Sequence, residues 1–157
     1  MTDAPKPTAV YLDADVFIHL VEGEPELAEA ARRLLTDIPG RDARIVTSEI
    51  TLAEALAPSG NRERRPSGLR RQYISLIAHN DMVRLMPVTR KVLYETVELR
   101  RTVRHKLPDA IHCATAVVSG CRFLVSRDRR MRLLPQGLKW FDADMQGVGR
   151  LLGSLHE

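Results

Sequence analysis

The chain has 157 residues, 44% of them hydrophobic and 4% aromatic, which fits one globular domain whose core is filled by aliphatic side chains and alanine. The net charge is +4, and all but four of the 24 basic residues are arginines. This favours a polyanionic partner, although codon usage in a GC-rich genome would give the same bias. The polar N-terminus, the absence of a long apolar run and only two cysteines argue against an export signal, a membrane span and a disulfide framework, and predict a cytoplasmic protein.

Apolar patterns in the first half of the chain predict strands that alternate with helices. Residues 1–8 are polar and are expected to be flexible. The elements expected next, in chain order, are a buried strand over 9–12, helices over 16–21 and 25–38, a strand over 43–46 and a helix over 49–57. Residues 58–71 hold five arginines together with glycines and prolines, and we expect a basic loop there that leads into a helix ending near His79.

The second half repeats the alternation. The expected elements are a strand over 82–86, helices over 89–104 and 108–119, a strand over 122–125, a candidate fifth strand over 138–141, and a C-terminal tail over 147–157 that is either a short helix or a frayed end. Strands alternating with helices predict an α/β fold, a three-layer α/β/α sandwich around a central, mostly parallel sheet of four to five strands. We expect a single domain over residues 1–157.

Four carboxylates stand where the pattern turns from strand to helix, or in the helix that follows: Asp13, Glu54, Asp109 and Asp128. In a parallel α/β fold these positions converge in the crevice at the carboxyl ends of the strands. Carboxylates gathered there repel one another unless a cation lies between them. The placement therefore predicts a divalent metal site, and a metal site suggests phosphate chemistry.

Each of these acids also has a local explanation. Asp13 is compatible with a turn at the end of a strand, and Glu54 with a capping box that it would form with Thr51. Asp109 is compatible with a favourable charge at a helix N-terminus, and Asp128 with a loop position paired to a neighbouring arginine. The joint placement of the four acids is what favours the metal site.

Four segments resemble, in order, the four sequence motifs of PIN-domain ribonucleases: YLDADVFI at 11–18, TSEITLAEAL at 47–56, LPDAIHCATA at 107–116 and LVSRDRRM at 124–131. The third segment is the most specific of the four, and together they cover nearly the whole chain. In its length and its lack of further domains, the whole chain is similar to VapC-type toxins of toxin–antitoxin pairs. The resemblance implies Mg²⁺- or Mn²⁺-dependent cleavage of RNA that leaves 5′-phosphate and 3′-hydroxyl ends, a homodimer, and inhibition by a cognate antitoxin protein.

The expected catalytic residues are the four acids. Because Mg²⁺ prefers oxygen ligands and takes few carboxylates directly, we expect Asp13 and Asp109 as its main ligands. Asp128 would bind it directly or through water, and Glu54 would hold a water or a second ion. Ser126 is a supporting residue that would orient Asp128 or a water, or else cap a turn.

Two features depart from the motifs. The family usually has a small polar or amide residue where this chain has Asp15, which we expect to be a helix N-cap rather than a metal ligand. The segment 58–71 is richer in arginine than the pattern requires, which leaves RNA, an acidic antitoxin surface and solvent as its possible contacts. Candidate RNA-binding residues are Arg62, Arg64, Arg65, Arg127, Arg129 and Arg130.

The sequence is also compatible with other roles for individual residues and with other functions of the protein. His112 is expected to be structural, because Mg²⁺ sites are built from oxygen ligands. The pair Asp13 and Asp15 satisfies the D-x-D core of haloacid-dehalogenase phosphatases, although Phe17 stands where that family has Thr or Val. A PIN-like module that binds RNA or protein without cutting, or a housekeeping PIN nuclease outside any toxin pair, would also fit the motifs.

Overall fold

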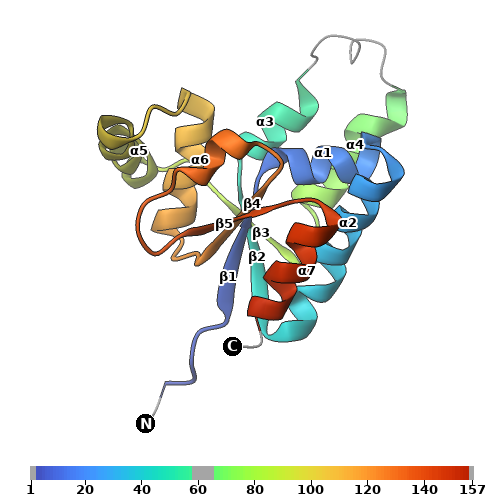
Figure 1. Cartoon of the computed structure of the whole chain (residues 1–157). Coiled ribbons are helices and arrows are strands. Elements are labelled where there is room, and N and C mark those ends of the chain that lie inside the picture. The colour runs from blue at the N-terminus through green and yellow to red at the C-terminus, as the bar shows by residue number, and fades with distance from the viewer. Residues whose placement is uncertain (1–2, 58–65, 156–157) are drawn as a thin grey trace.

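The middle layer of the protein is a sheet of five parallel strands, as the computed structural model in Figure 1 shows. The structure describes residues 3–57 and 66–155. In spatial order the strands are β3 (Val83–Met86), β2 (Ala43–Ser48), β1 (Thr8–Leu12), β4 (Phe123–Ser126) and β5 (Lys139–Asp142). Every neighbouring pair is parallel, so the predicted α/β class is confirmed and the candidate fifth strand is present.

Helices connect the strands and cover both faces of the sheet. They are α1 (Ala14–Glu22), α2 (Pro25–Asp37), α3 (Ile50–Leu56), α4 (Ser67–Ile77), α5 (Arg90–Thr102), α6 (Leu107–Val118) and α7 (Met145–Ser154), with short 3₁₀ turns η1 (Pro39–Arg41) and η3 (Arg129–Arg132). None of these helices is long and apolar enough to cross a membrane, a finding that covers the described residues alone.

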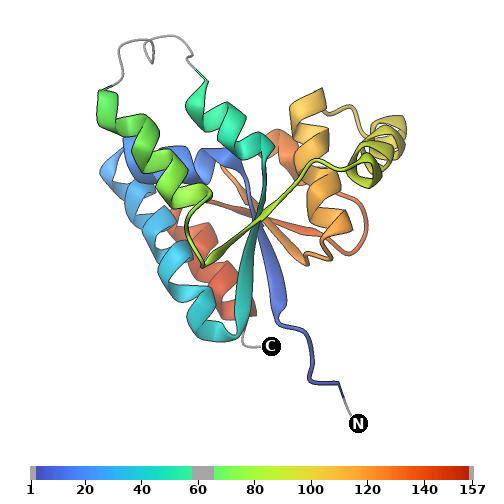
Figure 2. The ribbon, with the colours of Figure 1, turned by 180° about the vertical axis from the view of Figure 1, so that it is seen from behind.

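The alternation of side chains along β1 divides the core into two halves. Val10 and Leu12 face one half, which is completed by apolar residues of α1, α2, α4 and α7. Ala9 and Tyr11 face the other half, which is completed by α5 and α6. Figures 1 and 2 show these two groups of helices on opposite sides of the sheet.

The C-terminal segment is an ordered helix, which excludes the expectation of a frayed end. Asp144 caps α7 by accepting a hydrogen bond from the backbone N–H of Gly147. Val148, Leu151 and Leu152 are buried against the core beside α2. The helix begins two residues before the predicted tail because Asp144 supplies the N-cap.

Candidate active site

Asp13 lies at the point where the connections of the sheet reverse direction. From the central strand β1 the chain passes to β2 on one side, whereas β4 lies on the other side. In open parallel sheets the crevice for ligands forms at this position, outside the carboxyl ends of the strands. Asp13 directly follows β1, and only 6% of its surface is exposed. Its Oδ1 accepts a hydrogen bond of 2.8 Å from Ala14 N, which makes Asp13 the N-cap of α1.

Ser126, at the end of β4, joins the two acids at the start of α1. Its Oγ lies 2.8 Å from Asp13 Oδ2 and 3.1 Å from Asp15 Oδ2, so its single proton is within reach of either carboxylate. The same oxygen accepts a hydrogen bond of 2.9 Å from Asp128 N. The predicted supporting role of Ser126 therefore takes a specific form, in which one hydroxyl holds two acids and the backbone of a third.

Asp15 is not the helix cap that the sequence analysis expected, because Asp13 occupies that position. Asp15 lies in the first turn of α1, and its Oδ2 accepts a hydrogen bond of 2.8 Å from Arg127 N. Its Oδ1 is buried and has no partner among the described residues. Burial, followed by repulsion from Asp13, raises the pKa of Asp15 to about 8. An added cation would relieve both penalties.

The fully buried imidazole of His112 connects the acids to the second half of the core. Its Nδ1 lies 2.6 Å from Tyr11 Oη, and its Nε2 lies 2.6 Å from Glu54 Oε1 and 3.3 Å from Asp13 Oδ1. Burial by itself lowers the pKa of His112, but Asp13 and Glu54 outweigh it and raise the pKa above its ordinary value. These contacts are compatible with a neutral ring that accepts from Tyr11 and donates to Glu54, or with a protonated ring.

Asp109 reaches the crevice from the first turn of α6. Burial raises the pKa of its carboxyl group, and the charges of Asp13 and Asp128 raise it further. Asp13 and Asp128 follow two other strands of the sheet, and their negative charges act on Asp109. The three acids are therefore close enough to interact electrostatically. The predicted convergence of Asp13, Asp109 and Asp128 is therefore present in the fold.

Asp128 is held by the arginine that follows it. It caps the turn η3 by accepting a hydrogen bond of 3.0 Å from Arg130 N. The Arg130 side chain also donates to both carboxylate oxygens, from Nε to Oδ1 at 3.0 Å and from Nη2 to Oδ2 at 2.9 Å. These hydrogen bonds hold the pKa of Asp128 below its ordinary value.

The remaining candidate arginines have different surroundings. Arg127 directs its guanidinium toward the end of β5, where Nη1 lies 2.8 Å from Asp142 Oδ1 and 3.7 Å from Asp144 Oδ2. Arg129 is the exposed first residue of η3. The other three candidates, Arg62, Arg64 and Arg65, lie outside the described residues.

The donor set of this crevice fits a hard divalent cation. All five acids (Asp13, Asp15, Glu54, Asp109 and Asp128) offer carboxylate oxygens, and the buried Oδ1 of Asp15 lacks a partner among the described residues. As the side chains stand, however, no three His, Cys, Asp or Glu residues of 3–57 and 66–155 are close enough together to enclose an ion. Glu54 is bound to His112 and Asp128 to Arg130, so a cation entering here would require small movements of these side chains.

The sequence predicts a structural role for His112, and its buried hydrogen bonds agree with that role, but its partners could not be predicted. The only signal in the sequence is the position of His112, which stands one turn after Asp109 on an apolar face of α6. Its partners Tyr11 and Glu54 are 101 and 58 residues away along the chain, so no local spacing signals the network.

The fold and the acidic crevice define the class of the protein: a parallel α/β domain with a carboxylate site at the switch point of its sheet. The PIN domain family matches residues 10–136, and the chain belongs to this family. No curated protein sequence matches the chain.

Solved structures support the fold at low sequence identity. A toxin–antitoxin complex from Klebsiella pneumoniae has 20% identity and a TM-score of 0.63, covering 82% of this chain and 94% of that one. VapBC2 from Rickettsia felis, bound to a DNA fragment of its promoter, has 14% identity and a TM-score of 0.59 (86% and 98% covered). VapC20 from Mycobacterium tuberculosis, described as a sarcin–ricin loop cleaving toxin, has 18% identity and a TM-score of 0.58 (73% and 86% covered).

Proposed function

We propose that this PIN-domain protein is a metal-dependent endoribonuclease and the toxin of a toxin–antitoxin pair. The observation that carries the proposal is the acidic crevice itself, where Asp13, Asp15 and Asp109 are gathered although burial and mutual repulsion raise the pKa values of Asp15 and Asp109. Such an arrangement is costly for stability and is commonly retained where function needs it. The similar solved structures, which are toxins and toxin–antitoxin complexes, support the same proposal.

The cofactor of the proposed reaction is Mg²⁺ or Mn²⁺, with Asp13 and Asp109 as its main ligands, Asp128 as a further direct or water-mediated ligand, and Asp15 close by. When bound, the ion would lower the pKa of the attacking water and neutralise part of the negative charge on the phosphate. No step depends on His112 as a ligand, because its two ring nitrogens are already engaged by Tyr11 and Glu54.

Side chains of the chain would position the acids and the attacking water and accept a proton. Ser126 holds the Asp13 carboxylate in place, and Arg130 does the same for Asp128. Glu54, oriented by His112 and partly exposed, would position the attacking water and accept its proton. Attack on phosphorus breaks the bond to the 3′ oxygen and leaves a 5′-phosphate and a 3′-hydroxyl.

The partners in this proposal are an RNA substrate, a cognate antitoxin protein and a second copy of the chain, all in the cytoplasm. An apolar surface suited to a homodimer is present on α5, where Leu93 and Tyr94 are 45% and 67% exposed. Analytical ultracentrifugation of the wild type and of Tyr94→Glu measures the assembly directly, and a wild-type monomer would exclude the homodimer.

The experiment that tests the proposal is incubation of purified protein with a mixed RNA pool in Mg²⁺, in Mn²⁺ and in EDTA. Asp109→Asn removes a proposed ligand, and Asp81→Asn, an exposed position at the opposite edge of the sheet before β3, is the matched control. We expect discrete fragments in either metal, with none in EDTA or from Asp109→Asn. Sequencing of the fragment ends identifies the target and the end chemistry.

A second function, binding of RNA without cleavage, is favoured by one observation. Glu54 and Asp128 are already engaged by His112 and Arg130. A non-catalytic module would retain RNA binding and give no fragments in any metal. The same incubation, followed by a filter-binding assay on the intact RNA, separates the two functions.

A further inference from the structure

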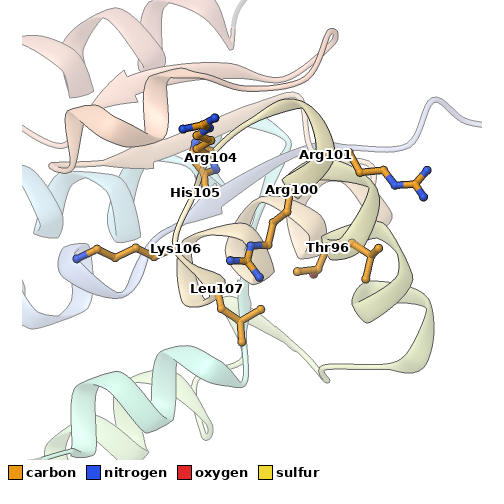
Figure 3. Close-up of a pocket in the computed structure, with 8 residues that line it drawn as sticks. Thr96, Arg100, Arg101, Arg104, His105, Lys106 and Leu107 are labelled. Carbon is orange, nitrogen blue, oxygen red and sulfur yellow. The ribbon is translucent and has the colours of Figure 1, made fainter.

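A basic cavity of about 630 Å³ lies at the junction of α5 and α6, on the half of the molecule that also supplies Asp109 (Figure 3). It is lined by Thr96, Val97, Arg100, Arg101, Arg104, His105, Lys106 and Leu107. Four of these side chains are cationic, and the described residues of the lining include no carboxylate. The volume is within the range of pockets that hold small ligands.

Most of these cations are not neutralised within the protein. The Arg101 side chain points away from Arg100 in Figure 3 and has an acidic neighbour, Glu98, at 3.6 Å. Arg100 extends toward the start of α6, beside Leu107. Arg100, Arg104 and Lys106 form no ion pair with any residue in the described part of the chain. Unpaired cations around one hollow attract an anion.

The base of the cavity adds a buried polar group. The Thr96 hydroxyl is satisfied, because it donates to Val92 O at 2.8 Å. His105 is only 8% exposed, its Nδ1 lies 3.7 Å from Cys113 Sγ, and its Nε2 has no partner among the described residues. This ring nitrogen is itself buried, so a ligand in the cavity would reach it only after a side chain of the lining moved.

The cavity is also close to the acidic crevice. Lys106 is the residue before α6, and Asp109 lies in the first turn of the same helix. The positive charge of Lys106 is felt by Asp128, whose pKa it helps to lower. A chain of phosphates that passes over the crevice would therefore lie near Lys106, and Arg100 and Arg104 line the same cavity as Lys106.

We propose that this cavity binds the backbone phosphates of the RNA strand next to the phosphate that is cut, with Arg100, Arg104 and Lys106 as the binding residues. The inference rests on the proposed nuclease function. An RNA backbone fits the surroundings because arginine pairs with phosphate oxygens through a planar fork of donors, without regard to base sequence.

The test is fluorescence anisotropy of a labelled single-stranded RNA oligonucleotide in EDTA, so that binding is measured without cleavage. Arg100→Ala/Arg104→Ala removes two exposed cations, and we call it the α5 variant because Arg100 lies in α5 and Arg104 follows the end of that helix. Arg32→Ala/Arg33→Ala on α2, across the sheet, is the control with the same change in charge. We expect the α5 variant to bind about tenfold more weakly per arginine. The slope of log Kd against log salt should fall by roughly 1 per arginine, while the control stays near the wild type.

Cleavage assays then separate this inference from the proposed function. We expect the α5 variant to raise KM and to leave kcat nearly unchanged, whereas Asp109→Asn abolishes cleavage. Wild-type affinity and KM in the α5 variant, together with an inactive Asp109→Asn, would overturn the phosphate site and leave the nuclease standing. Loss of binding to polyglutamate with unchanged RNA binding would assign the cavity to an acidic protein segment instead. A wild-type chain that neither binds nor cuts RNA would overturn both proposals.

Discussion

His112 Nε2 and Glu54 Oε1 are 2.6 Å apart and join helices α6 and α3 across 58 residues of sequence. The same ring contacts Tyr11 on the central strand. One fully buried side chain thus connects two helices and a strand at the edge of the acidic crevice. Burial lowers the pKa of His112, and the nearby charges of Asp13 and Glu54 outweigh this effect, so the ring and the two acids are electrostatically linked.

Replacement of His112 by alanine should therefore destabilise the protein strongly. The variant leaves a cavity and removes one partner each of the Tyr11 hydroxyl and the Glu54 carboxylate, and these losses together should cost about 3 kcal/mol. Urea unfolding measures the difference, with His79→Ala, an exposed histidine after α4, as the control. A loss below roughly 0.5 kcal/mol, the range of ordinary surface substitutions, would contradict the structural role given to His112.

Ser126→Ala removes a hydroxyl that Asp13, Asp15 and the backbone of Asp128 all use. Asp13 and Asp15 keep their bonds to backbone N–H groups but lose the hydroxyl, and this loss should cost about 1–3 kcal/mol and lower cleavage, because one oxygen of Asp13 is no longer held. Ser119→Ala is a matched control, since the Ser119 hydroxyl is buried but has no partner among the described residues. Thermal unfolding of the two variants should separate them clearly, and equal losses would argue against the Ser126 network.

The strands and the acids could be predicted from the sequence because their signals are local. The apolar run before Asp13 marks β1, and Pro108 at the start of α6 marks the helix that carries Asp109. The competition between Asp13 and Asp15 for the cap of α1 was decided by where β1 ends. Asp13 continues the strand pairing through a hydrogen bond of 3.0 Å from its N–H to Val125 O, so α1 begins directly after it.

Contacts between distant segments could not be predicted from a single sequence. The link between Arg130 and Asp128 is local, and an arginine partner for this acid could therefore be predicted from the sequence. The cavity at Arg100 and Lys106 depends on how α5 and α6 pack together, which no residue pattern specifies. Tertiary packing, not propensity, decides which polar groups meet in such places.

The two cysteines should be unreactive in the folded protein. Burial is the main cause that raises the pKa of Cys113 and of Cys121 to about 12. Each thiol keeps its proton in the folded protein up to a pH near 12, but loses it near pH 8.5 in the unfolded chain. The thiols therefore contribute to the free energy of unfolding below about pH 8.5, and this contribution is lost as the pH rises toward 12. We expect negligible reaction with a disulfide reagent at pH 8, complete reaction in urea, and a falling urea midpoint above pH 9. Rapid labelling of the native protein would contradict the burial of both groups.

Asp109→Asn should make the metal-free protein more stable and less responsive to metal. The wild-type carboxylate is repelled by Asp13 and Asp128, so its neutral replacement should raise the metal-free melting temperature by about 1–3 °C at neutral pH. Because the pKa of Asp109 is raised, its cost is absent in acid and grows as the pH rises through its titration range, so the advantage of the variant should disappear near pH 3.

Addition of Mn²⁺ completes this test by linkage, since an ion that binds only the folded chain raises its melting temperature. We expect a clear rise for the wild type and for Asp81→Asn, and a much smaller rise for Asp109→Asn. Differential scanning fluorimetry with a titration of Mn²⁺, and with Ca²⁺ as a comparison ion, measures each shift. A full wild-type response from Asp109→Asn would remove Asp109 from the proposed ligands, and Asp13→Asn would then show whether the acids at the start of α1 hold the ion without it.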